Sequence, residues 1–156
     1  MNEIIILLVL GALLSSFTML RPTPRQKQIA ALRETARERG MYVRVVAREP
    51  GERPGGVVYG RFWLAGELTR DRAVWRLERA ASGLPSELPE WRWAGKGAPI
   101  SAETLAKLVA DLPQDVDVIF TDEQGVGVCW RERGGAEAFS RVDEALRMLS
   151  RINEIN

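Results

Sequence analysis

The sequence contains no histidine and a single cysteine, Cys129. Without histidine the chain lacks the commonest general base and metal ligand, which excludes nucleophile activation by a Ser–His or Cys–His pair. A single cysteine also excludes an intramolecular disulfide. Because Cys129 falls within a predicted strand, we expect a small buried hydrophobic residue rather than a nucleophile. These absences favour a protein that is not an enzyme.

Motifs that bind metals or cofactors are lacking as well. Four carboxylates lie close together in the sequence: Asp115, Asp117, Asp122 and Glu123. A predicted strand runs through them, and their spacing does not fit a calcium-binding loop. The glycines at 125 and 127 do not form a dinucleotide fingerprint, because no suitable strand and helix flank them. We therefore expect no catalytic residue, no metal site and no cofactor.

Charge of either sign is missing from residues 4–20, which are almost entirely apolar. A helix of that length spans ~25 Å, enough to cross a thin bilayer. The basic start and the small-residue cleavage site of a signal peptide are absent. Residues 1–20 are therefore predicted to be a permanent transmembrane anchor.

Positive charge is concentrated directly after this segment. The basic residues between positions 21 and 40 are Arg21, Arg25, Lys27, Arg33, Arg37 and Arg39. Because flanking Lys and Arg are retained on the cytoplasmic side, the N-terminus is expected outside a bacterial inner membrane and the C-terminal domain in the cytoplasm.

Residues 21–40 are predicted to form a basic juxtamembrane helix. Thr23 is a suitable N-cap, Pro24 occupies the first helical position, and Gly40 fits the C-terminal stop. A thin apolar stripe leaves two interpretations open. In one, the helix packs on its own domain. In the other it lies against anionic headgroups, and its membrane-interface residues are Arg21, Arg25, Lys27 and Arg33.

The stretch MLRPTPRQK at residues 19–27 resembles the juncture of the small accessory subunit of the bacterial preprotein translocase (the YajC type). In that subunit the span runs into Leu-Arg-Pro and then into glutamine and basic residues. The whole chain is more similar to a group of uncharacterised single-pass inner-membrane proteins of gammaproteobacteria. These share the anchor, an Arg-Pro-x-Pro-Arg-Gln juncture, an Ala/Leu/Arg-rich helix and a Trp-containing α+β domain. The resemblance implies location and layout, and no activity.

Residues 41–152 are predicted to form an α+β domain, a small and mostly antiparallel sheet with two helices packed on one face. The expected elements are strands at 42–48, 57–65 and 73–79, a turn at 49–56, a short strand at 91–93, a helix after Ser101, and a helix at about 135–152. At 73–79 a helix stays open as the alternative. On the outer side of the last helix, Asp143 and Arg147 are expected to form an i,i+4 pair.

A hairpin is predicted between residues 115 and 132. Its loop is Glu123-Gln124-Gly125, with Gly125 in the left-handed region as a bulge. This register places Val118 opposite Trp130 on one face and Asp117 opposite Arg131 on the other.

Five tryptophans are the most unusual feature of the sequence: Trp63, Trp75, Trp91, Trp93 and Trp130. Three of them, at 63, 75 and 130, fall on predicted strands and are expected in the core. Trp91 and Trp93 lie in a Pro/Gly-rich segment and, with Arg92 between them, form a candidate partner-binding surface. The alternative is that this segment folds back and buries one of the two rings.

These observations predict a membrane-anchored, non-catalytic interaction or accessory module that docks onto an inner-membrane complex. Its expected partners are the membrane and other inner-membrane proteins, and self-association into a homo-oligomer is also compatible with the sequence. Nucleic acid is not an expected partner, because the net charge is only +1. Two alternatives stay open, a small-ligand-binding regulator and a histidine-free enzyme on the cytoplasmic membrane face.

Overall fold

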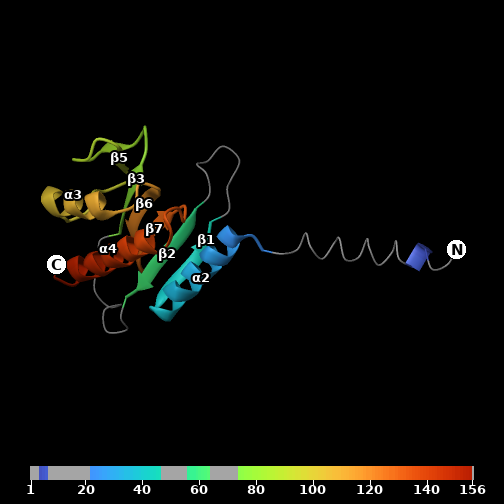
Figure 1. Cartoon of the computed structure of the whole chain (residues 1–156). Coiled ribbons are helices and arrows are strands. Elements are labelled where there is room, and N and C mark those ends of the chain that lie inside the picture. Colours follow the sequence, from blue (N-terminus) through green and yellow to red (C-terminus); the bar gives the residue numbers. More distant parts are fainter. Residues whose placement is uncertain (1–3, 7–21, 47–55, 64–73, 156) are drawn as a thin grey trace.

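The computed structural model describes residues 4–6, 22–46, 56–63 and 74–155 of the chain (Figure 1). Within these residues seven strands form one antiparallel sheet in the order β1-β2-β7-β6-β3-β5-β4. The strands are β1 Met41–Val45, β2 Val57–Phe62, β3 Trp75–Arg79, β4 Leu84–Pro85, β5 Trp91–Trp93, β6 Val116–Thr121 and β7 Gly125–Trp130. The predicted turn at 49–56 lies outside the described residues except for Gly56.

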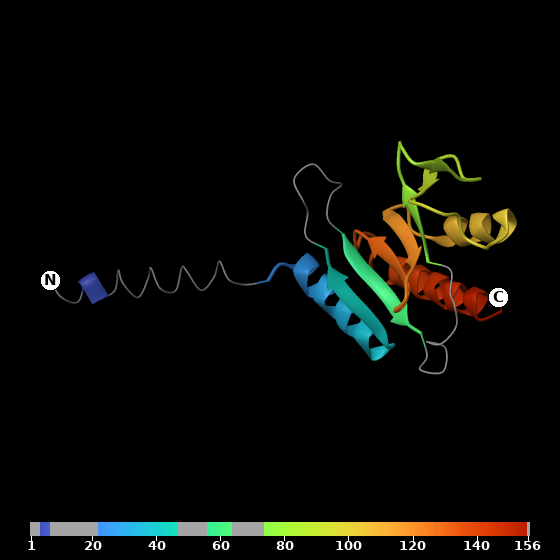
Figure 2. The same ribbon diagram turned by 180° about the vertical axis from the view of Figure 1, so that it is seen from behind.

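Three helices in the described part of the chain cover one face of this sheet. They are α2 Pro24–Glu38, α3 Ala102–Asp111 and α4 Gly135–Ile155. Helix α4 lies in front of the sheet in Figure 1 and behind it in Figure 2, with α2 and α3 on either side of it. All three helices contribute to one hydrophobic core with the strands.

Helix α2 begins where the sequence predicts. The Thr23 hydroxyl accepts a hydrogen bond from the Gln26 backbone N–H at 3.2 Å, and the Gln26 side chain accepts one from the Thr23 N–H at 2.8 Å. This capping box satisfies two amide groups that a helix start leaves unpaired. Leu32 and Ala36 are buried against β1 and α4. The helix therefore packs on its own domain, which was one of the two interpretations.

The predicted fold class is corrected in its membrane part. In addition, three helices rather than the predicted two pack on one face of the sheet, because α2 joins α3 and α4 there. No helix among the described residues combines the length and the apolar composition that crossing a bilayer requires. Helix α3 has 10 residues, and α4 carries charged residues along its length. The structure describes residues 4–6 of the predicted anchor as helix, and residues 7–20 lie outside the described residues. The transmembrane and single-pass assignments are thus not supported, and the described residues from 22 to 155 form an antiparallel sheet with three helices.

The loop of the β6–β7 hairpin differs from the prediction. The Asp122 carboxylate accepts hydrogen bonds from the backbone N–H groups of Gln124 and Gly125, at 2.9 and 2.8 Å. Such an Asx turn closes the hairpin by itself. Gly125 does not have a positive φ, so the predicted left-handed bulge at this residue is wrong.

The register of this hairpin consequently shifts by one residue. Val118 pairs with Cys129 rather than Trp130, and an irregularity between Val116 and Val118 accommodates the extra residue, Asp117. The predicted cross-strand position of Asp117 opposite Arg131 is therefore wrong, although the two side chains do form an ion pair of 2.6 Å. Because side chains alternate along a strand, the shift turns Trp130 towards the helices and Val118 towards the opposite face.

The two faces of the sheet are therefore unequal. The covered face holds the main core, in which Trp63, Trp75 and Trp130 are buried as predicted. The opposite face, which we name the open face, carries a second and smaller apolar cluster. Its members are Tyr42, Val58, Val118, Phe120 and Cys129.

Candidate functional site

Two buried carboxylates lie where α2, β2 and α4 meet. Asp143 is 3% exposed and Glu132 is 8% exposed. Burying a charged group is costly unless it is paired and hydrogen-bonded. Each buried carboxylate therefore needs partners that compensate its charge. Both are paired with arginines from other parts of the chain.

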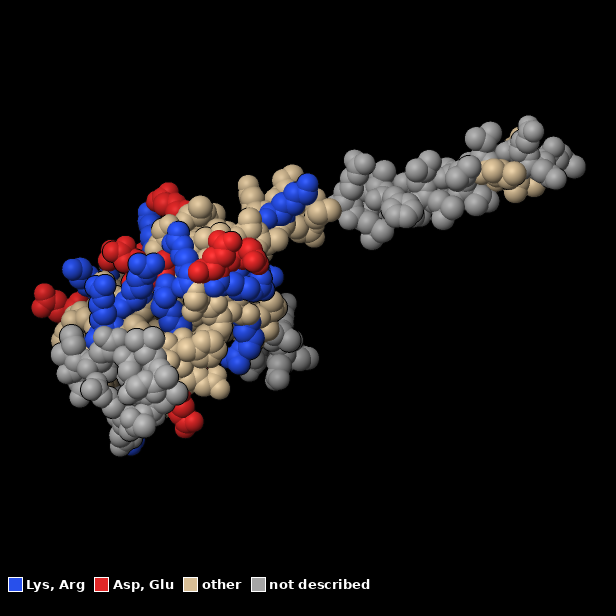
Figure 3. All heavy atoms as spheres, turned by 90° about the horizontal axis from the view of Figure 1, so that it is seen from below, with Lys and Arg blue, Asp and Glu red and all other residues tan. Residues whose placement is uncertain are grey.

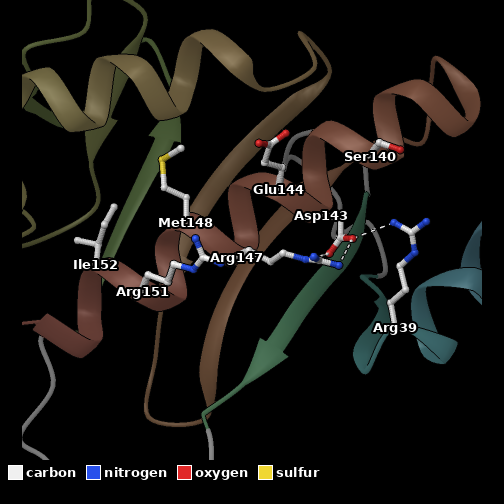
Figure 4. Close-up of a pocket in the computed structure, with 8 residues that line it drawn as sticks. All are labelled: Arg39, Ser140, Asp143, Glu144, Arg147, Met148, Arg151 and Ile152. Atoms are coloured by element: carbon white, nitrogen blue, oxygen red, sulfur yellow. Dashed lines mark hydrogen bonds and ion pairs between the residues drawn. The ribbon is translucent and has the colours of Figure 1, made fainter.

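Asp143 holds three arginines together, and Figure 4 shows two of them, Arg39 and Arg147. Arg39, directly after α2, donates to one carboxylate oxygen at 2.9 Å, and Arg61 of β2 donates to the other at 2.5 Å. Arg147, one turn along α4, donates to both oxygens, at 3.0 and 3.3 Å. One carboxylate thus ties a helix end, a strand and a second helix together.

Electrostatics keep Asp143 ionised. Burial by itself would raise the pKa of its carboxyl, but the hydrogen bonds from Arg61, Arg39 and Arg147 outweigh burial and hold the pKa below its usual range. A carboxylate with a lowered pKa is a weak base at neutral pH. The geometry suits Asp143 for positioning arginines rather than for proton transfer.

Glu132 forms the second junction. Arg33 of α2 donates to both of its carboxylate oxygens, at 2.8 and 2.7 Å, and the Tyr59 hydroxyl donates to one of them at 2.6 Å. Burial and this hydrogen bond both raise the pKa of Tyr59. Glu132 adopts a φ of +58°, uncommon for a residue with a side chain. This backbone turn directs the carboxylate back under α2.

A cavity of about 480 Å³ lies beside Asp143. Its lining combines arginines from two elements with an apolar wall (Figure 4). The residues are Arg39, Ser140, Asp143, Glu144, Arg147, Met148, Arg151 and Ile152. Three arginines and two carboxylates provide the charged groups of this lining.

Aromatic rings lying over glycines shape the open face. Tyr42 pairs with Gly60 across β1 and β2, and Phe120 pairs with Gly127 across β6 and β7. A Cβ atom at either glycine would collide with the ring of its partner. Gly60 and Gly127 are themselves cross-strand partners, so the two rings lie in one row across four strands. The two glycines thus leave room for aromatic side chains to lie flat on the sheet.

Next to this row the open face has a hollow of about 340 Å³. Val58, Val118, Phe120 and Cys129 provide its apolar wall, and Val74, which is 59% exposed, lies at its side. The charged residues that line the same hollow are Arg44, Arg76 and Asp122. Burial and the nearby Asp117 raise the pKa of the Cys129 thiol, which disfavours the reactive thiolate.

The four residues predicted at a membrane interface have different environments in the structure. Arg21 lies outside the described residues, whereas Arg25 and Lys27 are exposed on the first turn of α2. Arg33 is engaged with Glu132 inside the fold. Only two of the four thus present free surface in the described part of the chain.

The candidate partner-binding tryptophans are in the core. Trp91 is 3% and Trp93 is 8% exposed, and Trp93 packs edge-on against Trp75 with ring centroids 5.8 Å apart. Arg92 between them is half-buried and donates to the backbone oxygens of Pro89 and Trp91. The alternative, in which this segment folds back, is closer to the structure, and it buries both rings instead of one.

Sequence reasoning missed the arginine junctions. The i,i+4 pair of Asp143 with Arg147 is confirmed, but Asp143 is buried rather than on the outer side of α4. Its other two partners come from positions about 80 and 100 residues away. The available signal was the position of Asp143 directly beside the apolar Val142 and among the residues that face the core.

The chain matches no model of a known protein family, no curated protein sequence and no solved structure.

Proposed function

We propose that this protein is a non-catalytic interaction module that binds another protein through the open face of its sheet. The observation that carries this proposal is the asymmetry of the sheet. Described helices cover one face. On the other face Val58, Val118 and Phe120 are only 5%, 7% and 8% exposed, but they form the wall of a hollow beside the exposed Val74. A hollow with an apolar wall and charged residues around it is suited to receiving an apolar side chain of a partner protein.

The hollow indicates what the partner presents. Its wall is apolar, and the charged side chains Arg44, Arg76 and Asp122 line it from around that wall. An apolar side chain inserted among Val118, Phe120 and Val74 would gain burial, and polar groups beside it would meet the charged residues. The flat rings of Tyr42 and Phe120 extend the surface across four strands.

The chemistry of the reactive groups supports a non-catalytic role. A lowered pKa makes Asp143 a weak base, and a raised pKa makes Cys129 a weak nucleophile at neutral pH. Both shifts are opposite to those that acid–base or thiol catalysis requires. Arg33 and Tyr59 together donate three hydrogen bonds to Glu132.

The proposal is tested with two matched surface variants of the full chain, V74D and L84D. Val74 and Leu84 are 59% and 57% exposed, but only Val74 lines the hollow. In gently disrupted cells that naturally make the protein, the native chain and L84D should sediment in a complex larger than the chain itself. V74D should sediment as the free chain, with an unchanged melting temperature.

Equal behaviour of V74D and L84D would refute the proposal. A complex with the mass of two copies of the chain would assign the open face to self-association and would also contradict a different partner.

A further inference from the structure

We propose that the cavity between Arg39 and the C-terminal half of α4 binds a phosphate group carried by a small molecule. This site is separate from the open face, since it lies on the helix-covered side of the sheet. Basic side chains gather on the side of the molecule seen in Figure 3. Those that line the cavity are Arg39, Arg147 and Arg151.

The first argument is an imbalance of charge. Arg39 and Arg147 line the cavity and share the carboxylate of Asp143 with Arg61, which does not line it. Arg151 adds a further cation, and no ion pair links it to another described residue. Glu144 on the cavity wall offsets one charge only. The lining therefore carries three arginines against two carboxylates, and this excess of positive charge attracts an anion.

The second argument is the set of donors that remain. Arg39 uses one terminal nitrogen for Asp143, and Arg147 uses Nε and one terminal nitrogen. Arg39 Nε and the other terminal nitrogens of both residues make no hydrogen bond to another described residue. Arg39 also stacks on the Phe139 ring at 5.3 Å. Asp143 and Phe139 therefore hold these guanidinium groups in place before a ligand arrives.

The third argument concerns the shape of the ligand. A phosphate monoester has three acceptor oxygens and nearly two negative charges at neutral pH. It can accept hydrogen bonds from guanidinium groups that approach from different directions, whereas a carboxylate is planar and singly charged. Met148 and Ile152 form an apolar part of the wall, which suits the organic portion of a phosphate ester. A cavity of about 480 Å³ has the size of a small-molecule site.

Calorimetric titration of the full chain with phenyl phosphate tests this inference, with benzoate as the carboxylate probe. Phenyl phosphate should bind, and benzoate should bind about tenfold more weakly because it has one charge fewer. The variant R151Q should weaken phenyl phosphate binding by about tenfold. The control R141Q should change it by less than about twofold, because Arg141 is exposed on α4, pairs with Glu137 and does not line this cavity.

Three results would each overturn the inference. They are no heat of binding up to about 10 mM phenyl phosphate, equal binding of benzoate and phenyl phosphate, and the same loss of affinity in R151Q and R141Q. The last result would mean that the overall charge of α4, and not the cavity, attracts the anion. None of these results affects the outcome expected for the V74D variant. The proposal for this cavity and the proposal for the open face can therefore be refuted independently.

Discussion

At the scale of single residues, Asp143 accepts more hydrogen bonds than any other described side chain. It is nearly inaccessible to solvent and accepts hydrogen bonds from arginines of β2 and α4 and from the residue that follows α2. Removing one partner of a buried ion pair leaves the other charged groups without compensation. The stability of the junction should therefore depend on the charge of Asp143 more than on its shape.

The variant D143N preserves that shape and removes the charge. We expect it to lower the free energy of unfolding by about 3 kcal/mol, measured by urea denaturation at neutral pH. D111N is the matched control, because Asp111 is exposed at the end of α3. It should stay within about 0.5 kcal/mol of the native chain. Equal stability of the native chain and D143N would show that the three arginines do not depend on the charge.

The pH dependence follows from the lowered pKa of Asp143. Because the unfolded chain takes up the proton at a higher pH than the folded chain, the stabilising contribution is complete above the unfolded pKa, about 3.9. It is lost as the pH falls through the lower, folded pKa. The stability difference between the native chain and D143N should thus be constant from pH 7 to about 5 and shrink below about 4. A difference that stayed unchanged on acidification would contradict this.

At the scale of elements, α2 is fixed to the domain by its arginines as well as by its apolar stripe. Arg33 sits on the face that meets Glu132, whereas Arg25 is exposed on the first turn. The sequence alone treats both as equivalent cations of one basic helix. Their three-dimensional environments make them different.

Substitution of Arg33 by alanine should therefore lower the free energy of unfolding by about 3 kcal/mol, because Glu132 is left buried with one partner fewer. The same change at Arg25 should cost less than about 0.5 kcal/mol. Urea denaturation of both variants measures the difference. If R25A and R33A lost the same stability, the Arg33–Glu132 pair would not be a fixed part of the fold.

Substitution of a glycine on the open face tests how tightly the aromatic rings pack on the sheet. A methyl group at Gly127 would collide with the Phe120 ring, whereas at Gly97 the nearest atoms lie 3.6 Å away. We expect G127A to destabilise the protein by about 1–3 kcal/mol through overpacking, and G97A to stay within about 0.5 kcal/mol. Thermal unfolding of the two variants measures this difference in stability. A stable G127A would mean that the ring leaves its position easily.

Local signals predicted the elements well and their partners poorly. Thr23, Ser101 and the alternation around Trp75 act within a few residues, and the caps and the strand they predict are present. The register of β6 and β7 failed because the Asp122 side chain closes the turn, which apolar pairing does not reveal. The partners of Asp143 and Glu132 could not be predicted, since they depend on how distant segments come together.

At the scale of the whole molecule, the domain is two-sided. Helices and arginine junctions occupy one side of the sheet, and the open face presents aromatic rings over glycines on the other. This division separates the two proposals in space. One proposal assigns the cavity beside α4 to a small phosphate-bearing ligand, and the other assigns the open face to a protein partner.

The central claim is that a partner protein contacts the open face. A photoreactive amino acid placed at position 74 or at position 84 of the full chain reports that contact directly, because Val74 and Leu84 are almost equally exposed. We predict a discrete cross-linked product with a different protein from position 74, in a yield at least about fivefold above that from position 84. Equal yields from the two positions, or no product from position 74, would contradict the account.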